Sequence, residues 1–186
     1  TATPPPGGGA RVTNGLQVLY TFAENSGSVI GDVSGVGSPL NLQIGSPGAV
    51  SWITGGGLAI NASASITAQS EETKIISACK ASNELTLEAW IKPANSTQDG
   101  PARILTFSLD SLNRNFTLGQ EFSAYDVRLR TTTTSENGVP SLATGSGAVS
   151  TQLSHVVFTR AASGVTKIYK NGVEAASGST GGNFSG

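Results

Sequence analysis

The sequence lacks several residue types that would define a particular chemistry. Cys79 is its single cysteine, so no disulfide can form within the chain. His155 is its single histidine, so no His/Cys cluster exists to hold zinc. Charged residues make up 12% of the 186 residues and the formal net charge is -1. This balance gives no electrostatic basis for binding nucleic acid or inserting into an anionic membrane.

Two further absences concern the chain as a whole. No apolar run approaches the ~20 residues that a membrane span needs. There is no methionine, so Thr1 is not a translation start, and we expect either a removed targeting segment or a fragment. Four N-x-S/T sequons are compatible with N-glycosylation and with a location outside the cell, at Asn61, Asn95, Asn115 and Asn183.

The residues that are abundant favour short strands joined by tight turns. Glycine occurs 24 times and hydrophobic residues make up 37% of the chain, a composition that argues against a helical bundle. Residues 154–173 carry the clearest pattern. Two alternating runs, 155–160 and 165–170, flank turn residues at 161–164, and a second turn signal follows at Asn171-Gly172. This pattern predicts a β-meander.

Similar alternation predicts strands along most of the chain. Gly15–Ala23 places Leu16, Val18, Tyr20 and Phe22 on one face. Further strands are expected at 40–44, 58–60, 84–92, 103–109, 115–119, 125–131 and 141–144. The regular spacing predicts an all-β, antiparallel jelly-roll sandwich over residues 11–186. Residues 1–10 are rich in proline and glycine and are predicted to be a tail or linker.

One short helix is expected near residues 71–80. Ser70 is its predicted N-cap, and Lys80 lies in its last turn, where the helix dipole favours a cation. Ile75 and Cys79 fall on one side at helical spacing. We therefore expect the helix to lie against the edge of the sandwich, with Cys79 as a small buried hydrophobic residue.

Three stretches of sequence resemble a known family. They are LQVLYTFAENSGSVIGDVSG at 16–35, KIISACKASNELTLEAWIKPAN at 74–95 and HVVFTRAASGVTKIYKNGV at 155–173. Together they resemble the laminin-G-like jelly roll of the concanavalin A-like lectin/glucanase superfamily, over about residues 16 to 180. The resemblance implies a sandwich module that binds glycans, proteins or ions, or that only spaces other domains.

The sequence departs from this family pattern near its end. The family usually continues through further strands that return alongside the first strand. Here residues 174–186 leave room for at most one short strand, near 173–177. We therefore expect a sandwich that lacks its last strands and has an open sheet edge, which another chain could pair with. The N-terminal tail of a neighbouring copy is one candidate for this partner.

Catalytic groups do not cluster in the sequence. The glucanase branch of the superfamily uses an E-x-D-x-E strand, which this chain lacks. Glu84 and Glu88 would share a strand face about 13 Å apart, which is too far for either glycosidase geometry. His155 has no G-x-S-x-G partner motif, and the family resemblance implies that its strand position is a packing position. The sequence therefore predicts a protein that is not an enzyme and needs no cofactor.

Five residues are candidates for ligand binding. A sugar needs an exposed aromatic ring, and the available rings are Trp52, Trp90 and Tyr125, although large aromatics also serve as core. Arg128 and Arg130 share one strand face, which suits either an anionic ligand or simple solvation.

A calcium site is the one metal site that the sequence allows. Glu24, Asn25 and Asp32 bracket one loop and supply the oxygen ligands that calcium prefers. The alternative is that Asp32, which precedes Ser34-Gly35, forms an Asx turn.

Two functions from different classes follow from these patterns. The first is a non-catalytic recognition or adhesion module, located outside the cell or on its surface, that binds a glycan or a surface protein. The second is a structural subunit of an extracellular filament or surface assembly, in which a neighbouring chain completes the open sheet edge.

Overall fold

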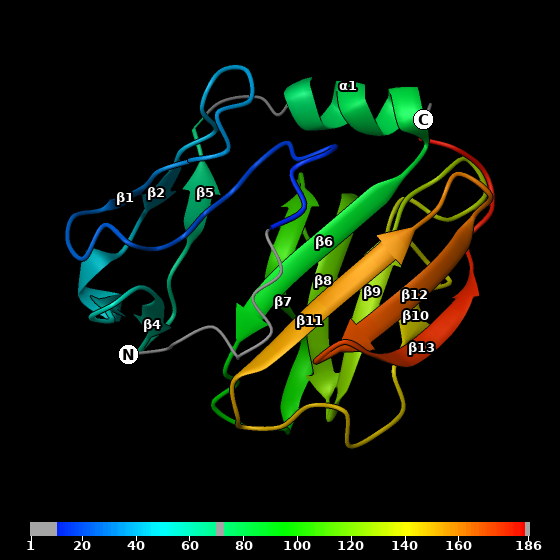
Figure 1. Cartoon of the computed structure of the whole chain (residues 1–186). Coiled ribbons are helices and arrows are strands. Elements are labelled where there is room, and N and C mark those ends of the chain that lie inside the picture. Colours follow the sequence, from blue (N-terminus) through cyan, green and yellow to red (C-terminus); the bar gives the residue numbers. More distant parts are fainter. Residues whose placement is uncertain (1–10, 70–72, 185–186) are drawn as a thin grey trace. The chain divides into compact units, whose positions relative to one another are not determined.

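The computed structural model describes residues 11–69 and 73–184, which form two compact units. The N-terminal unit runs from Thr1 to Ala78 and the C-terminal unit from Cys79 to Gly186 (Figure 1). The expected tail, residues 1–10, and the expected cap of the helix, Ser70, lie outside the described residues.

The N-terminal unit contains two small antiparallel sheets. The larger sheet has three strands in the order β1-β2-β5, formed by Val29–Ile30, Leu42–Ile44 and Ile66–Ala68. The smaller is a hairpin of β3 (Val50–Trp52) and β4 (Leu58–Ile60), preceded by a 3-10 turn at Pro47–Ala49. The core of this unit consists of Ile30, Leu40 and Ile44, whose side chains are 0%, 6% and 2% exposed.

The strand predicted over Gly15–Ala23 does not form. Leu19 makes contacts with a loop instead of a neighbouring strand, because its N–H donates to Asp32 Oδ1 and its carbonyl accepts from Val33 N–H. Phe22 has a φ of 52°, which lies outside the extended region. The alternation of apolar residues was therefore a misleading signal for a strand at this position.

The predicted helix is present as α1 (Thr73–Ser82). The residue after the helix, Asn83, caps it. Asn83 has a left-handed φ of 56°, and its N–H donates to the Cys79 carbonyl. None of its residues is fully buried, and Cys79 is only half-buried, so the prediction of a fully buried Cys79 was wrong. Burial still raises the pKa of the Cys79 thiol. No helix within the described ranges is long and apolar enough to cross a membrane.

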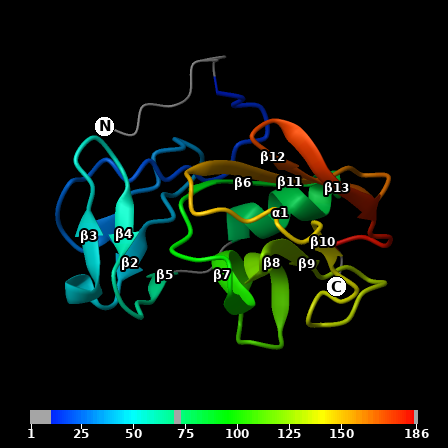
Figure 2. The same cartoon turned by 90° about the horizontal axis from the view of Figure 1, so that it is seen from below.

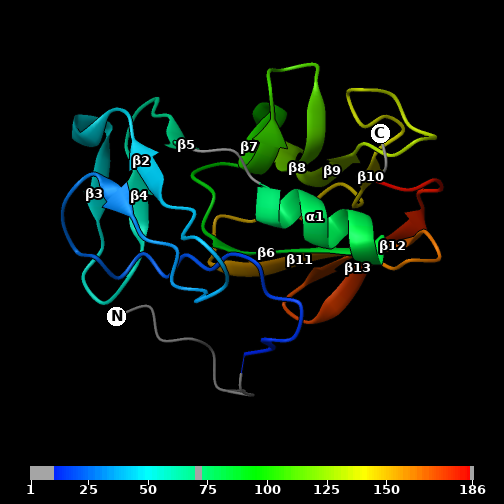
Figure 3. The same cartoon turned by 90° about the horizontal axis from the view of Figure 1, so that it is seen from above.

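The C-terminal unit is built from two four-stranded antiparallel sheets. One has the order β13-β12-β11-β6 and the other the order β10-β9-β8-β7 (Figure 2 and Figure 3). The strands in chain order are β6 Leu85–Ile91, β7 Gln98–Ser108, β8 Arg114–Phe122, β9 Ala124–Leu129, β10 Leu142–Ala143, β11 Ser154–Arg160, β12 Val165–Lys170 and β13 Val173–Ser179.

The two sheets pack against each other through one face each, and β8 and β9 are also buried on their other face, at Thr117 and Asp126. Burial alternates along β11, where Val156 and Phe158 are buried while His155 and Val157 are only half-buried. Apolar side chains from both sheets fill the core: Leu85, Leu87, Phe116, Leu118, Tyr125, Val127, Leu129, Val156, Phe158 and Ile168. This arrangement confirms the predicted all-β, antiparallel sandwich and the predicted meander.

The meander has the turns that its sequence predicts. Strands β12 and β13 pair through Lys170 and Val173, and Asn171 and Gly172 between them have φ values of 52° and 81°. Two successive positive φ values define a type I′ hairpin turn, which glycine and asparagine adopt at low cost. The Asn171 side chain also accepts the His155 N–H at 2.9 Å, which ties this turn to β11.

A buried arginine fastens the last described residues to the end of the sandwich. Arg160 is 2% exposed, and its guanidinium donates to three carbonyls, those of Asn83, Thr180 and Gly182, at 2.5, 3.3 and 2.7 Å. Its Cζ lies 4.9 Å from the centre of the Phe184 ring. Burial lowers the Arg160 pKa, but a guanidinium keeps its charge in proteins, so it needs all of these acceptors.

We expect Arg160→Met to lower the free energy of unfolding by about 2 kcal/mol or more, because it removes a buried guanidinium that donates to the carbonyls of three residues from separate segments. The measurement is urea unfolding of the two proteins. Arg130→Met is the matched control, since Arg130 is partly exposed and lies 3.8 Å from an exposed Glu136. The control should change stability by no more than about 0.5 kcal/mol. Equal losses in both variants would contradict the role assigned to Arg160.

Candidate functional site

The outward face of the sheet β13-β12-β11-β6 gathers aromatic and polar side chains. In β6 the inward residues Leu85 and Leu87 are buried, and alternation turns Glu88 and Trp90 away from the core. The register pairs Trp90 with His155 across the strands and Glu88 with Val157. We call this surface the Trp90 face and define it by its outward residues: Thr86, Glu88, Trp90, His155, Val157, Thr159, Lys167, Tyr169 and Glu174.

Three residues of the Trp90 face hold one another in place. The rings of Trp90 and His155 are stacked, with centres 4.6 Å apart and planes 16° apart. His155 Nε2 lies 3.0 Å from Glu88 Oε1. Trp90 is nevertheless 43% exposed. Because the imidazole covers one side of the indole, much of the exposed area belongs to the opposite side and the outer edge.

The far end of the Trp90 face carries an ion pair. Lys167 Nζ donates to Glu174 Oε2 at 2.8 Å, and both side chains are substantially exposed. This contact lowers the pKa of Glu174 and raises the pKa of Lys167. The register places Val157 and Tyr169 next to each other in one row across the four strands, with Glu88 and Glu174 at the two ends of that row.

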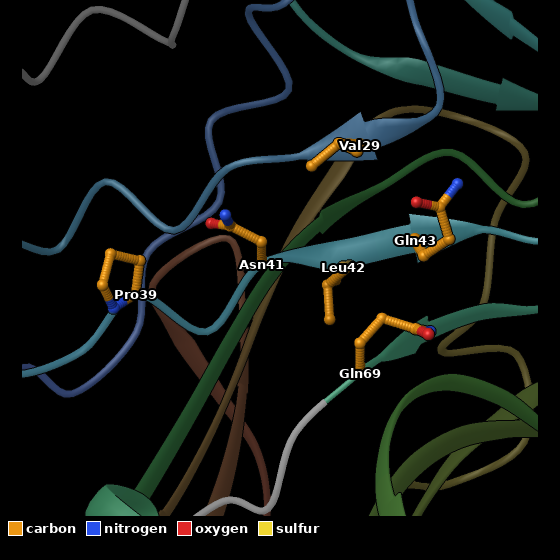
Figure 4. A pocket seen from close by; sticks show the side chains of 6 residues that line it. All are labelled: Val29, Pro39, Asn41, Leu42, Gln43 and Gln69. Atoms are coloured by element: carbon orange, nitrogen blue, oxygen red, sulfur yellow. The ribbon is translucent and has the colours of Figure 1, made fainter.

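A second candidate site is a hollow of about 330 Å³ in the N-terminal unit (Figure 4). Three amide side chains line it, from Asn41, Gln43 and Gln69. The apolar part of the lining comes from Val29, Pro39 and Leu42. None of these six lining residues carries a charge.

The structure separates the predicted aromatic residues. Tyr125 is fully buried in the sandwich core, so its prediction as a binding ring was wrong. Trp52 lies on β3 in the N-terminal unit, where its Nε1–H donates to the Gly27 carbonyl at 3.0 Å and its ring is half-buried. Trp90 alone of the three is classed as exposed.

The two predicted arginines already have partners. Arg128 Nε lies 3.2 Å from Asp126 Oδ2, and its Nη1 donates to Asn137 Oδ1 at 3.3 Å. Arg130 lies 3.8 Å from Glu136. An anionic ligand would have to compete with these carboxylates, so the pair remains a weaker candidate than the Trp90 face.

The predicted calcium residues form a different arrangement. Asp32 accepts the N–H groups of Leu19, Ser34 and Leu40 at 3.0 to 3.1 Å, together with the Lys74 ammonium at 2.5 Å. The Ser34 bond is that of the Asx turn given as the alternative reading. Because these four donors occupy both carboxylate oxygens, and one is itself a cation, the residues do not fit a calcium ion.

The neighbours of Asp32 do not complete a metal site either. Glu24 Oε1 accepts the Gly31 N–H at 2.8 Å, and the Asn25 amide donates to the Ala23 carbonyl at 2.7 Å. Among the described residues, no group of three or more His, Cys, Asp or Glu side chains could hold a metal ion.

The four asparagines of the sequons are all exposed; they are Asn61, Asn95, Asn115 and Asn183. Asn61 Nδ2 donates to Ser51 Oγ at 2.8 Å, and Asn95 Oδ1 accepts the Thr97 N–H at 3.0 Å. N-glycosylation of these positions stays a prediction.

Sequence reasoning missed the part that His155 plays. It was expected to be a packing residue, but the structure places its ring on the outward face against Trp90. Alternation along β11 could have indicated this, because His155 has the opposite parity from the buried Val156 and Phe158. The pairing with Trp90 also needs the register of β6 and β11, which the sequence alone does not supply.

The comparison with protein families agrees with this architecture. A laminin G-type model, described as the concanavalin A-like lectin/glucanases superfamily, matches residues 62–186. The chain therefore belongs to this superfamily. A search of curated proteins and a search of solved structures found no match.

The buried carboxylate of Asp32 predicts an acid-sensitive fold. Burial alone would raise its pKa, but the Lys74 ammonium and three backbone N–H groups hold that pKa well below its usual value. The stabilisation is therefore complete above the unfolded-state pKa of about 3.9 and falls as the pH drops below about 4. We expect Asp32→Asn to cost roughly 2–3 kcal/mol at pH 7, and much less at pH 2.

Urea unfolding at pH 7, 5, 4, 3 and 2 measures this effect. Asp99→Asn is the control, because Asp99 is exposed and makes one local bond, to the Gly100 N–H. The account of Asp32 would be wrong if the cost of Asp32→Asn were the same at every pH.

Proposed function

We propose that this protein is a non-catalytic recognition module that acts outside the cell and binds a glycan through the Trp90 face. The single observation that carries the proposal is an exposed indole stacked on an imidazole, which in turn contacts a carboxylate. Membership of a superfamily that includes lectins supports the same class of function.

A fixed indole suits the flatter, C–H-rich side of a sugar ring. Trp90 needs no reordering to present its free side, because His155 and Glu88 already restrict the ring. Less conformational entropy is then lost on binding, which favours affinity. The indole combines a large apolar surface with a polar N–H, a combination common at recognition surfaces.

The remaining residues of the Trp90 face suit the hydroxyl groups of a longer glycan. Glu88 and Glu174 can accept hydrogen bonds, and Thr86 and Thr159 can both donate and accept them. Four strands about 4.8 Å apart make the face roughly 14 Å wide. A surface of this width fits an extended oligosaccharide better than a single sugar.

The carboxylates support binding better than hydrolysis. Glu88 contacts His155, whereas Glu84 Oε1 accepts the Ala162 N–H at 3.4 Å. Each carboxylate therefore has a partner of its own, and the two do not converge on one position. Glycosidases need two carboxyl groups that flank a single bond.

We expect Trp90→Ala to lower the affinity for a bound glycan roughly tenfold or more, because the variant loses the stacking surface. A glycan array identifies the ligand, and isothermal titration calorimetry measures its affinity. Trp52→Ala is the matched control, since Trp52 is the second tryptophan and lies in the other unit. Near-ultraviolet circular dichroism checks that both variants are folded.

Two outcomes would contradict the proposal. One is binding that survives in Trp90→Ala but disappears in Trp52→Ala. The other is an array on which the wild-type protein binds no glycan at all.

The second candidate function, an assembly subunit, rests on strand β13. β13 lies at one edge of its sheet in the described part of the C-terminal unit, and six of its seven residues are exposed. It contains one charged residue, Glu174, which Lys167 already contacts. Strand edges with few charges tend to pair with other chains, although the register shift next to Tyr169 works against a long pairing.

Size-exclusion chromatography with light scattering separates the two functions. If β13 mediates assembly, the protein should form multimers, and Ala175→Lys should restore a monomer by placing a charge at an exposed position of that edge. Val33→Lys, at an exposed position in the other unit, is the control. A wild-type protein that remains an 18.8 kDa species at high concentration would rule out assembly through this edge.

A further inference from the structure

The hollow in the N-terminal unit has a fixed pattern of hydrogen-bonding groups (Figure 4). The orientation of each amide side chain follows from its backbone partner, because a backbone N–H can only donate a hydrogen bond and a carbonyl can only accept one. Asn41 Oδ1 accepts the Asp32 N–H at 3.0 Å, which leaves the Asn41 Nδ2 hydrogens without a partner among the described residues. Gln43 Nε2 donates to the carbonyls of Ser28 and Ile44 at 3.0 and 3.2 Å, and no donor within residues 11–69 and 73–184 contacts Gln43 Oε1, which is left as an acceptor.

The third amide is held more loosely. Gln69 Nε2 lies 3.5 Å from the Thr67 carbonyl and 3.4 Å from Thr67 Oγ1, both at the long end of hydrogen bonding. It can therefore turn to donate or accept. The hollow thus offers a fixed donor at Asn41, a fixed acceptor at Gln43 and an adaptable amide at Gln69.

The apolar lining adds a second requirement. Val29, Pro39 and Leu42 offer hydrocarbon surface next to the amides, and Val29 is 45% exposed. A ligand would therefore carry a hydrogen-bond donor, an acceptor and a small apolar group close together, and no charge. The volume lies at the lower end of the roughly 300–1,000 Å³ of small-molecule sites.

We propose that this hollow binds the acetamido group of an N-acetylated sugar. The acetamido carbonyl would accept from Asn41 Nδ2, its N–H would donate to Gln43 Oε1, and its methyl group would pack on Val29, which pairs with Gln43 across the strands. A plain hexose lacks the methyl group, and a free amino sugar carries a positive charge that none of the lining residues balances. This site is independent of the Trp90 face, because it lies wholly within the other unit.

Solution NMR with ¹⁵N-labelled full-length protein tests the proposal. The probes are N-acetylglucosamine, glucose and glucosamine, each titrated to millimolar concentration. We expect N-acetylglucosamine to shift the side-chain amide signals of Asn41, Gln43 and Gln69, and the other two sugars to leave them unchanged. N-methylacetamide, which has the same amide without the sugar, should bind more weakly if the sugar ring contributes.

Asn41→Asp is the most informative variant. It keeps the acceptor for the Asp32 N–H but replaces the donor with a carboxylate oxygen, so affinity should fall roughly three- to tenfold or more. Asn61→Asp is the matched control, since Asn61 is an exposed asparagine in the same unit. Gln69→Met tests the site without touching Asp32, and it should weaken binding while keeping the fold.

Three results would overturn the proposal: no shift with N-acetylglucosamine, equal shifts with glucose, or N-methylacetamide binding as tightly as the sugar. The last would assign the hollow to peptide-like amides instead. A failure here leaves the Trp90 face untouched, because Trp90→Ala should not alter these amide signals. Conversely, glycan binding that is lost in Trp90→Ala but retained in Asn41→Asp would support the Trp90 face alone.

Discussion

Burial of one face of each four-stranded sheet is the constraint on which the C-terminal unit depends. The inward residues at the middle of β6, β11 and β12, which are Leu87, Phe158 and Ile168, are apolar. Their neighbours along each strand therefore point outward, and the register fixes which outward residues meet. A slip of one residue would turn Trp90 and His155 into the core and expose Leu87 and Phe158. The aromatic pair of the Trp90 face is thus a consequence of how the core packs.

Polar side chains solve a second problem, which is to hold segments that have few strand partners. Asp32 connects loops of the N-terminal unit, because its carboxylate accepts hydrogen bonds from three N–H groups and from the Lys74 ammonium. Arg160 connects the last described residues to the rest of the C-terminal unit, because its guanidinium donates to three carbonyls. Each buried charge is satisfied by several groups from different segments, so each stabilises long-range contacts that backbone ladders do not supply.

The prediction from sequence succeeded where periodicity and turn chemistry agreed. Val165–Lys170 alternates and is followed by Asn171-Gly172, and both the strand and its turn form as expected. Gly15–Ala23 alternates equally well, yet no strand forms there, because Leu19 bonds to the Asp32 loop and Phe22 leaves the extended region. Alternation shows that a segment can form a strand, but a strand also needs a partner that accepts its hydrogen bonds.

The sequence by itself determined the class of fold and the meander, because these depend on local periodicity and turn residues. Only the tertiary structure decided that Tyr125 is core, that Asp32 pairs with Lys74, and that His155 stacks on Trp90. The reason is physical: these contacts join residues 42 to 65 positions apart, and their formation depends on strand register and packing, which no local pattern of side chains encodes.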